Sequence, residues 1–255
     1  MGPTADGTQV HFFPLVNPQG VCGAIEVEHA ALLDAQQEQL VNGLLAIYRN
    51  YLNLLDYSEH DTLTGLLNRK TFDRMFARRV AGRATRERPD RNIEIVGSQR
   101  TAKPGETPWL AVVDIDLFKR INDRYGHIFG DEVLLLTSRL MRACFRSSDV
   151  LFRFGGEEFV ILLAPTDAEG AHGALERFRS AVETNDFPQV DQVTVSVGYS
   201  RALPDENPNA PFERADEALY YAKQNGRNRV CRHEALIEQG QLPVKPSKSS
   251  DLELF

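Results

Sequence analysis

Two apolar segments joined by a short turn constrain the fold of this chain more than any other feature. The segments are VLFRF at 150–154 and FVILLA at 159–164, and Gly155-Gly156-Glu157-Glu158 connects them. Two glycines permit a tight reversal of the chain, so we expect an antiparallel β-hairpin. From residue 109 onward the other apolar segments alternate between strand and helix patterns. A hairpin within such an alternation predicts an α+β (α/β-like) fold with a central mixed sheet flanked by helices.

The expected elements are arranged in order along the chain. Strand patterns lie at 109–116, 150–154, 159–164 and 193–200. Helix patterns lie at 69–80, 117–125, 131–145, 168–184 and 211–226, and a turn at 61–68 precedes the first of them. Between 81 and 108 the chain is polar and contains Gly, Pro and many charges, which predicts a long surface loop with a short strand at 92–96.

The N-terminal residues have a different pattern. The segments on either side of Asn17-Pro18-Gln19-Gly20 predict two short strands, and the tetrapeptide is a turn signal. Two strands alone do not form a stable domain, so residues 1–28 either are the remnant of a larger sheet or pack on the next part of the chain. Their pattern is similar to the last strands of a GAF-type sensor domain.

Residues 29–57 contain no proline and predict one long helix. Two apolar stripes with heptad spacing run along it, one through Leu40, Leu44 and Ile47 and the other one position further along. One stripe could pair with a second subunit, or the whole helix could pack on its own domain. We expect a signalling and dimerisation helix here, a main domain at 58–233 and a polar tail at 234–255.

Composition narrows the class of protein. The chain has 255 residues and a net charge of −7, which argues against a general nucleic-acid binder. Its three cysteines are far apart and have neither the spacing of a zinc site nor that of a disulfide framework. No apolar run approaches the roughly 18 residues that span a bilayer, and the N-terminus lacks the pattern of a signal peptide. We therefore expect a cytoplasmic protein without a membrane span in this chain.

Acidic side chains gather at two strand ends. Asp114 and Asp116 flank Ile115, and alternation directs both carboxylates to one side while Ile115 enters the core. Carboxylates beside an exposed backbone carbonyl suit a hard cation, although Asp at such a junction also commonly caps the next helix. Glu157 and Glu158 come directly after the glycines of the hairpin turn. One could bind a metal while the other faces a ligand, but an ordinary hairpin with solvated acids has the same sequence.

Two polar groups could recognise a nucleotide. Asn122 and Asp131 follow the first strand of the main domain, and Lys119 lies near them in the sequence. An Asn and an Asp can together recognise guanine, because the carboxylate accepts hydrogen bonds from N1–H and the exocyclic amine of the base. Lys223 and Arg227 are four residues apart near a helix end and could meet phosphates from one side. The alternatives are a polar helix face for the first group and favourable cation placement at a helix C-terminus for the second.

Together these pieces resemble the GGDEF domain of bacterial diguanylate cyclases, from residue 61 to about residue 229. The matching segments are DTLTGLLNR at 61–69, DIDLFKRIND at 114–123, YGHIFGD at 125–131, RFGGEEF at 153–159, SVG at 196–198 and AKQNGRNR at 222–229. Their order and spacing both fit, and GGEEF is a functional spelling of the family signature. The resemblance implies a central five-stranded sheet related to nucleotidyl cyclase and polymerase palm domains.

The resemblance also implies a role for each matching residue. Asp114, the carbonyl of Ile115 and Glu158 would bind Mg²⁺, with Mn²⁺ as the alternative. Glu157 would be a second ligand or would help to deprotonate the attacking hydroxyl. Guanine would be recognised by Asn122 and Asp131. The other contacts to GTP would come from Lys119, the backbone of Leu117 and Phe118, the turn at Gly155 and Gly156, and the cations Lys223 and Arg227.

The implied activity is the condensation of two GTP molecules into cyclic di-GMP with release of two pyrophosphates. One site holds one GTP, so the enzyme would act as a homodimer. Arg146 and Asp149 form an RxxD sequence at the offset where family members bind product and inhibit themselves, and a helix-end ion pair is the alternative. The competing function is a catalytically silent GGDEF-like receptor for GTP or cyclic di-GMP. Such receptors usually have a damaged signature, and this signature is intact.

Overall fold

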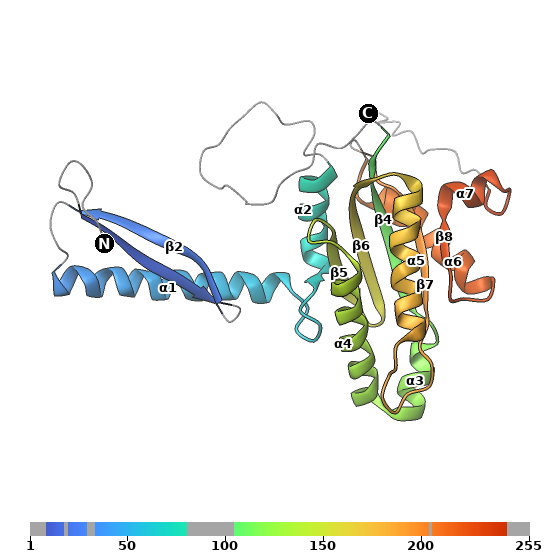
Figure 1. Cartoon of the computed structure of the whole chain (residues 1–255), viewed down its shortest axis with the longest axis horizontal. Coiled ribbons are helices and arrows are strands. Elements are labelled where there is room, and N and C mark those ends of the chain that lie inside the picture. Colours follow the sequence, from blue (N-terminus) through green and yellow to red (C-terminus); the bar gives the residue numbers. More distant parts are fainter. Residues whose placement is uncertain (1–8, 18–19, 30–33, 81–104, 204–205, 244–255) are drawn as a thin grey trace, which may run out of the picture. The chain divides into compact units, whose positions relative to one another are not determined.

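The structure is a computed structural model that describes residues 9–17, 20–29, 34–80, 105–203 and 206–243 (Figure 1). The strand expected at 92–96 lies outside the described residues. The chain divides into two compact units, Met1–His60 and Asp61–Phe255. No helix in the described ranges combines the length and the apolar character that crossing a bilayer requires.

The first unit contains a β-hairpin and a helix. Strands β1 (Gln9–Asn17) and β2 (Gly20–His29) pair antiparallel, as the turn signal predicts. Helix α1 (Ala35–Glu59) begins later than the predicted residue 29, which belongs to β2, and ends two residues beyond the predicted residue 57. Asp34 and Gln37 cap its start reciprocally. The N–H of Gln37 donates to Asp34 Oδ1 at 2.8 Å, and the N–H of Asp34 donates to Gln37 Oε1 at 3.0 Å.

The two apolar stripes of α1 differ in burial. Leu45, in the second stripe, is only 3% exposed, and α1 contacts β1 within this unit. Leu40, Leu44 and Ile47 of the first stripe are 66%, 59% and 68% exposed. We call these three residues the apolar strip of α1. Within the first unit, therefore, one stripe contributes a core residue while the other lies on the surface.

The second unit is built on a six-stranded mixed sheet in the order β3-β5-β6-β4-β7-β8. Its long strands, which pair antiparallel, are β4 (Thr107–Ile115), β5 (Val150–Gly155), β6 (Glu158–Thr166) and β7 (Val195–Arg201). The edge strands β3 (Leu67–Asn68) and β8 (Val230–Arg232) pair parallel to their neighbours. The mixed sheet is confirmed. It has six strands, one more than the resemblance implies. The four long strands match the four strand patterns of the sequence, and the two edge strands are too short to form a periodic pattern.

Helices cover both faces of this sheet. They are α2 (Arg69–Val80), α3 (Phe118–Tyr125), α4 (His127–Cys144), α5 (Ala168–Thr184), α6 (Asn209–Gln224) and α7 (His233–Glu238). Val113 and Ile115 of β4 share one core with residues of α4 and α5, which cross the near side of the sheet in Figure 1. Leu110 and Val112 share the other core with residues of α2 and α6. Ile115 is thus buried as predicted, and alternation directs Asp114 to the face of α2 and α6.

Gly198 on β7 allows α6 to approach the sheet closely. A Cβ at this position would lie 2.1 Å from both the carbonyl oxygen of Ala215 and the backbone nitrogen of Leu219. No side chain fits into that space, so the backbone of α6 lies directly on β7. Lys223 lies about one turn after Leu219, and this close packing therefore determines how near its ammonium comes to the sheet.

The C-terminal end differs from the prediction of a polar tail beginning at residue 234. Helix α7 occupies 233–238, and its Leu236 is buried. Glu234 Oε1 accepts a hydrogen bond from the N–H of Arg201 at 2.8 Å. The prediction was wrong for these residues because one buried leucine and one backbone contact hold a segment that is polar in composition. Residues 244–255 lie outside the described part of the chain.

Candidate active site

Two carboxylates stand opposite each other at the end of the central strands. The register of β4 and β6 pairs Asp114 with Glu158, and paired residues project their side chains on the same face of a sheet. Asp114 is only 8% exposed. Like charges in this arrangement destabilise a sheet, so the pair lowers stability in a way that a bound cation would reverse.

The groups around Asp114 show how the chain accommodates this repulsion. Burial raises the pKa of Asp114 to about 6, the ion pair with Lys223 opposes that shift, and the charges of Glu157 and Glu158 add to it. Lys223 Nζ lies 2.8 Å from Asp114 Oδ2. The structure therefore brings together four of the predicted site residues, which come from β4, the β5–β6 turn, the start of β6 and α6.

The turn between β5 and β6 consists of Gly156 and Glu157. Gly156 has φ +50°, a left-handed conformation that glycine adopts without strain. Arg153 of β5 spans the turn. Its Nε and Nη2 donate to the Gly156 carbonyl at 3.1 and 2.9 Å, and its Nη1 donates to Asp61 Oδ1 at 2.9 Å. The tip that carries the glutamates is thus held both by β5 and by the first residue of the second unit.

Asp61 organises the turn that precedes β3. Its Oδ1 accepts from the N–H and the hydroxyl of Thr64 at 2.8 and 2.7 Å, and the Thr64 carbonyl accepts from Arg142 of α4 at 2.7 Å. Burial alone would raise the pKa of Asp61, but hydrogen bonds from Thr64 and Arg153 outweigh it and lower the pKa below its usual value. Sequence reasoning gave Asp61 and Arg153 no role, although both lie in segments that match the GGDEF pattern.

The carboxylates of Asp116 and Asp114 have different hydrogen-bond and ion-pair partners. Its carboxylate is 7% exposed and accepts from Ser196 Oγ at 2.7 Å, Thr194 Oγ1 at 2.8 Å and the N–H of Asn228 at 3.0 Å. Both of its oxygens are therefore engaged by protein donors. Sequence reasoning expected the two aspartates to point the same way but did not foresee that only Asp114 would lie against the hairpin glutamates.

The predicted guanine-binding residues lie on α3 and α4. Asn122 of α3 packs over Gly130 at the start of α4, where a Cβ would lie 2.0 Å from Asn122 Oδ1. Asp131 comes directly after Gly130 and is exposed. The lack of a side chain at position 130 therefore lets the amide of Asn122 lie next to the backbone that carries Asp131.

The predicted phosphate-binding groups come from two helix ends. Leu117 has φ +58° and precedes α3, which begins at Phe118, so the first N–H groups of this helix have no partner within the helix. Lys119 in its first turn is exposed. Lys223 lies in the last turn of α6, and Arg227 lies in the loop beyond it, exposed and with φ +60°.

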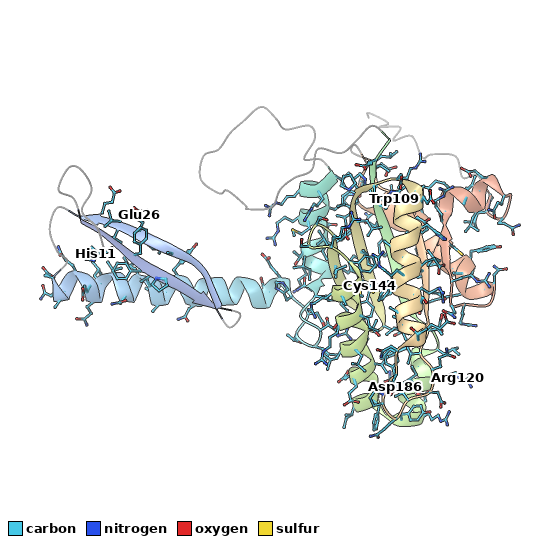
Figure 2. All side chains as sticks on the ribbon, in the orientation of Figure 1. His11, Glu26, Trp109, Arg120, Cys144 and Asp186 are labelled. Carbon is cyan, nitrogen blue, oxygen red and sulfur yellow. The ribbon has the colours of Figure 1, made fainter. Side chains whose placement is uncertain are left out.

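Arg146 and Asp149 lie together between α4 and β5. Asp149 Oδ2 accepts from the N–H of Arg146, and Oδ1 accepts from the N–H of Ala164, both at 2.9 Å. The carboxylate thus binds backbone groups, while the side chain of Arg146 is exposed. Just before them lies Cys144 at the end of α4, which Figure 2 labels. Its carbonyl accepts from Arg177 Nη2 of α5 at 2.7 Å.

The donor set at the end of β4 suits a hard divalent cation. Among the described residues, no three His, Cys, Asp or Glu side chains converge as a ready metal site. Mg²⁺, however, commonly uses one or two carboxylates and takes its other ligands from water and phosphate. Asp114, Glu158 and the Ile115 carbonyl meet that requirement, and a cation would relieve the repulsion between the two carboxylates. These residues therefore fit Mg²⁺.

Known proteins with similar sequences identify the family of this chain. Residues 58–229 match the family described as diguanylate cyclase, GGDEF domain. Diguanylate cyclase DgcM of Escherichia coli K12 is 37% identical over 173 residues, which cover 68% of this chain and 38% of DgcM. The chain thus spans well under half the length of that relative.

Solved structures give the same result. The coiled coil and GGDEF domain of DgcB from Caulobacter crescentus, in complex with c-di-GMP, is 28% identical with a TM-score of 0.62, covering 78% of this chain and 100% of that one. The active GGEEF domain of a diguanylate cyclase from Vibrio cholerae is 32% identical with a TM-score of 0.53, covering 66% of this chain and 97% of that one. These structures share with the chain a mixed sheet flanked by helices. The chain belongs to the GGDEF family of diguanylate cyclases.

The carboxylate pair predicts a stability change that depends on pH. The pKa of Asp114 in the folded protein, about 6, lies above its ordinary value of 3.8, so the folded state holds this proton more tightly. The favourable contribution is complete below about pH 4 and is lost as the pH rises through 6. Asp114→Asn should therefore stabilise the metal-free protein by about 1–3 kcal/mol at pH 7 and by much less at pH 4, as measured by denaturation in EDTA.

The control for this prediction is Asp216→Asn, which alters an exposed acid on α6. It should change stability by less than about 0.5 kcal/mol at both pH values. If Asp114→Asn has no effect at pH 7, the ionised pair does not destabilise the fold.

Proposed function

We propose that this chain is a diguanylate cyclase that condenses two GTP molecules into cyclic di-GMP and releases two pyrophosphates. The observation that carries the proposal is the pairing of Asp114 with Glu158, because two opposed carboxylates suit a cation bound to nucleotide phosphates. The relatives support it, since DgcM is named a diguanylate cyclase and the DgcB structure contains c-di-GMP. Because the reaction needs GTP, we assign it to the cytoplasm.

Asp114, Glu158 and the Ile115 carbonyl would hold Mg²⁺, with Mn²⁺ as the alternative. When bound, the metal neutralises phosphate charge and lowers the pKa of the attacking hydroxyl. Glu157, at the tip of the turn, serves as a further ligand or accepts the proton of that hydroxyl. Lys223 pairs with Asp114 in the absence of the cation and can turn to phosphate oxygens once the cation compensates the carboxylate.

The substrate contacts divide between base and phosphates. Asn122 and Asp131 recognise guanine, and their neighbouring placement on α3 and α4 supports this role. The triphosphate is held by the N–H groups at the start of α3 and by side-chain cations. The residues assigned to it are Leu117, Phe118, Lys119, Gly155, Gly156, Lys223 and Arg227.

In each half-reaction the 3′-oxygen of one GTP attacks the α-phosphorus of the other. A new phosphodiester bond forms, the bond to pyrophosphate breaks, and the hydroxyl proton passes to Glu157 or to water. Repeating the step in the opposite sense closes the ring and releases the second pyrophosphate. One domain binds one GTP, so two domains must face each other, and a homodimer supplies the proximity that the reaction needs.

Glu158→Ala tests the activity and separates an enzyme from a silent receptor. Loss of one metal ligand removes several kcal/mol of transition-state stabilisation, so cyclic di-GMP formation from GTP and Mg²⁺ should fall by at least about 100-fold. Cyclic di-GMP and pyrophosphate are measured together by chromatography. Glu169→Ala on α5, an exposed glutamate, is the control and should retain activity. An unsubstituted protein that binds GTP without turnover would favour the receptor instead.

The apolar strip of α1 supports pairing with a second copy. Leu40, Leu44 and Ile47 are exposed and line a surface hollow of about 470 Å³. An exposed apolar strip with heptad spacing is typical of a helix that pairs with another helix. The DgcB structure likewise combines a coiled coil with a GGDEF domain. We assign α1 to dimerisation and signal transfer from a sensor, of which β1 and β2 would be a remnant.

Replacing Leu40 and Leu44 together by lysine should disrupt this dimer. Two buried leucines contribute roughly 3–6 kcal/mol, so the dissociation constant should rise by at least about 100-fold in sedimentation equilibrium, and turnover at low protein concentration should fall. Asn42→Lys, on the same helix but outside the strip, is the control. Full activity at low concentration after deletion of residues 1–57 would contradict the role of α1.

Arg146 and Asp149 are proposed to bind the product and inhibit the enzyme. An exposed guanidinium offers a fork of donors to phosphate or guanine, and the backbone contacts of Asp149 hold both residues in one turn. The carboxylate keeps lone pairs available for a guanine edge. Because Asp149 also supports β6 through Ala164, substitution of Arg146 is the cleaner test.

Arg146→Ala should raise the inhibition constant for cyclic di-GMP by about ten-fold or more, because a charge-assisted contact is lost, while the initial rate without product stays unchanged. Initial rates at increasing product concentration measure this. Arg139→Ala, an exposed position on α4, is the control. Unaltered product inhibition in Arg146→Ala would rule out the site.

A further inference from the structure

A strained pair of residues lies just after α6. Arg227 and Asn228 have φ values of +60° and +44°, so two consecutive residues with side chains adopt the left-handed conformation. Residues other than glycine rarely do so, and such strain persists only where surrounding contacts impose it. The reason for this conformation must therefore lie in the contacts that the segment makes.

Asn228 is anchored through both its backbone and its side chain. Its N–H donates to Asp116 Oδ2 at 3.0 Å, its Oδ1 accepts from Arg179 Nη1 at 2.9 Å, and its Nδ2 donates to Glu183 Oε1 at 2.7 Å. Arg179 and Glu183 lie on α5 and form an ion pair with each other. A buried carboxylate and a helix ion pair thus hold this single residue from two sides.

Asp116 is the buried charge at the centre of these contacts. It also accepts from the hydroxyls of Ser196 and Thr194, so three donors compensate its removal from water. It comes directly after Ile115 at the end of β4. The same carboxylate therefore joins the strand that carries the proposed metal ligands to the loop that carries Arg227.

We propose that Asp116 is a positioning residue for the triphosphate of GTP, acting through Asn228 on Arg227. The inference rests on the proposed function, because it takes Arg227 as a phosphate ligand. Asp116 itself touches neither metal nor nucleotide, since protein donors engage its oxygens. Without this anchor the Asn228 backbone relaxes to a more common conformation and redirects Arg227. The consequence is weaker binding of phosphates, with the chemical step less affected.

Two substitutions at position 116 distinguish the effect of the hydrogen bonds of Asp116 from the effect of its negative charge. Asp116→Ala removes all three acceptor contacts. Asp116→Asn retains a hydrogen bond to each partner, because its carbonyl can still accept from Asn228 and Thr194 while its amide donates to Ser196 Oγ, which reverses that one bond. In the alanine variant the dissociation constant for nucleotide should rise by at least about ten-fold, which is the scale of one lost phosphate contact. In the asparagine variant it should stay within about three-fold of the value for the unsubstituted protein.

Calorimetric titration of the full chain with the α,β-methylene analogue of GTP and Mg²⁺ measures this binding. The analogue reports binding without turnover, because its bond to the leaving group does not break. Steady-state kinetics with GTP run alongside, and KM should rise more than kcat falls. Asp167→Ala is the matched control, because Asp167 caps the opposite end of α5 and its loss lowers stability without touching the loop. Equal effects of Asp116→Ala and Asp167→Ala on affinity would overturn the proposal.

Asn228 supplies a second test, which decides the matter if Asp116→Ala does not fold. Asn228→Ala and Asn228→Gly remove the same side-chain contacts, but only glycine accepts φ +44° without strain. The alanine variant should therefore bind the analogue more weakly than the glycine variant, and equal affinities would contradict the proposal. Failure of the proposed function looks different: the unsubstituted protein would bind the analogue yet form no cyclic di-GMP from GTP.

Discussion

Asp114 and Glu158 stand opposite each other on neighbouring antiparallel strands, where two like charges oppose the pairing of the sheet. The buried position of Asp114 strengthens that opposition, since the carboxylate has lost most of its water. A chain selected only for stability would place a threonine or a valine at such a pair. The surrounding structure instead compensates the charge with Lys223 and holds the strands together by other means. The pair of Asp114 and Glu158 therefore lowers the stability of the sheet locally, and other contacts of the second unit compensate for it.

That support comes from residues that do not belong to the acidic pair. Arg153 joins the hairpin tip to Asp61, and Asp116 joins β4 to the loop after α6. Each connection uses a charged group that is satisfied by several hydrogen bonds, which costs little stability and restricts geometry strongly. Two arms of the site, the glutamate turn and the loop of Arg227, are therefore each secured by their own buried or half-buried ion. The acids proposed to bind the cation, Asp114 and Glu158, are therefore different residues from Asp61 and Asp116, which hold the turn and the loop.

The sequence was sufficient to predict much of this architecture. The long strands, the hairpin and most helices of the second unit have clear periodicity, and the residues proposed for the site occur in short segments whose order is distinctive. The edge strands β3 and β8 were missed because two or three residues have no period, and α7 was missed because its single buried leucine is hidden in polar composition. The different uses of Asp114 and Asp116 also could not be predicted. Alternation gives both the same direction, and contacts from residues far along the chain distinguish them: Thr194, Ser196 and Asn228 donate to Asp116, whereas Lys223 pairs with Asp114.

Gly198 links the distance between α6 and the sheet to the ion pair between Lys223 and Asp114. Because the backbone of α6 rests on β7 there, a single methyl group at position 198 would act as a wedge and lengthen the ion pair between Lys223 and Asp114. At Gly173 on α5 a Cβ would have no atom within 4 Å, so a substitution there would not displace the helix. In this domain the space around a glycine therefore affects whether a larger residue is tolerated there. Gly198 contacts no proposed ligand, yet it affects how strongly Lys223 compensates the negative charge of Asp114.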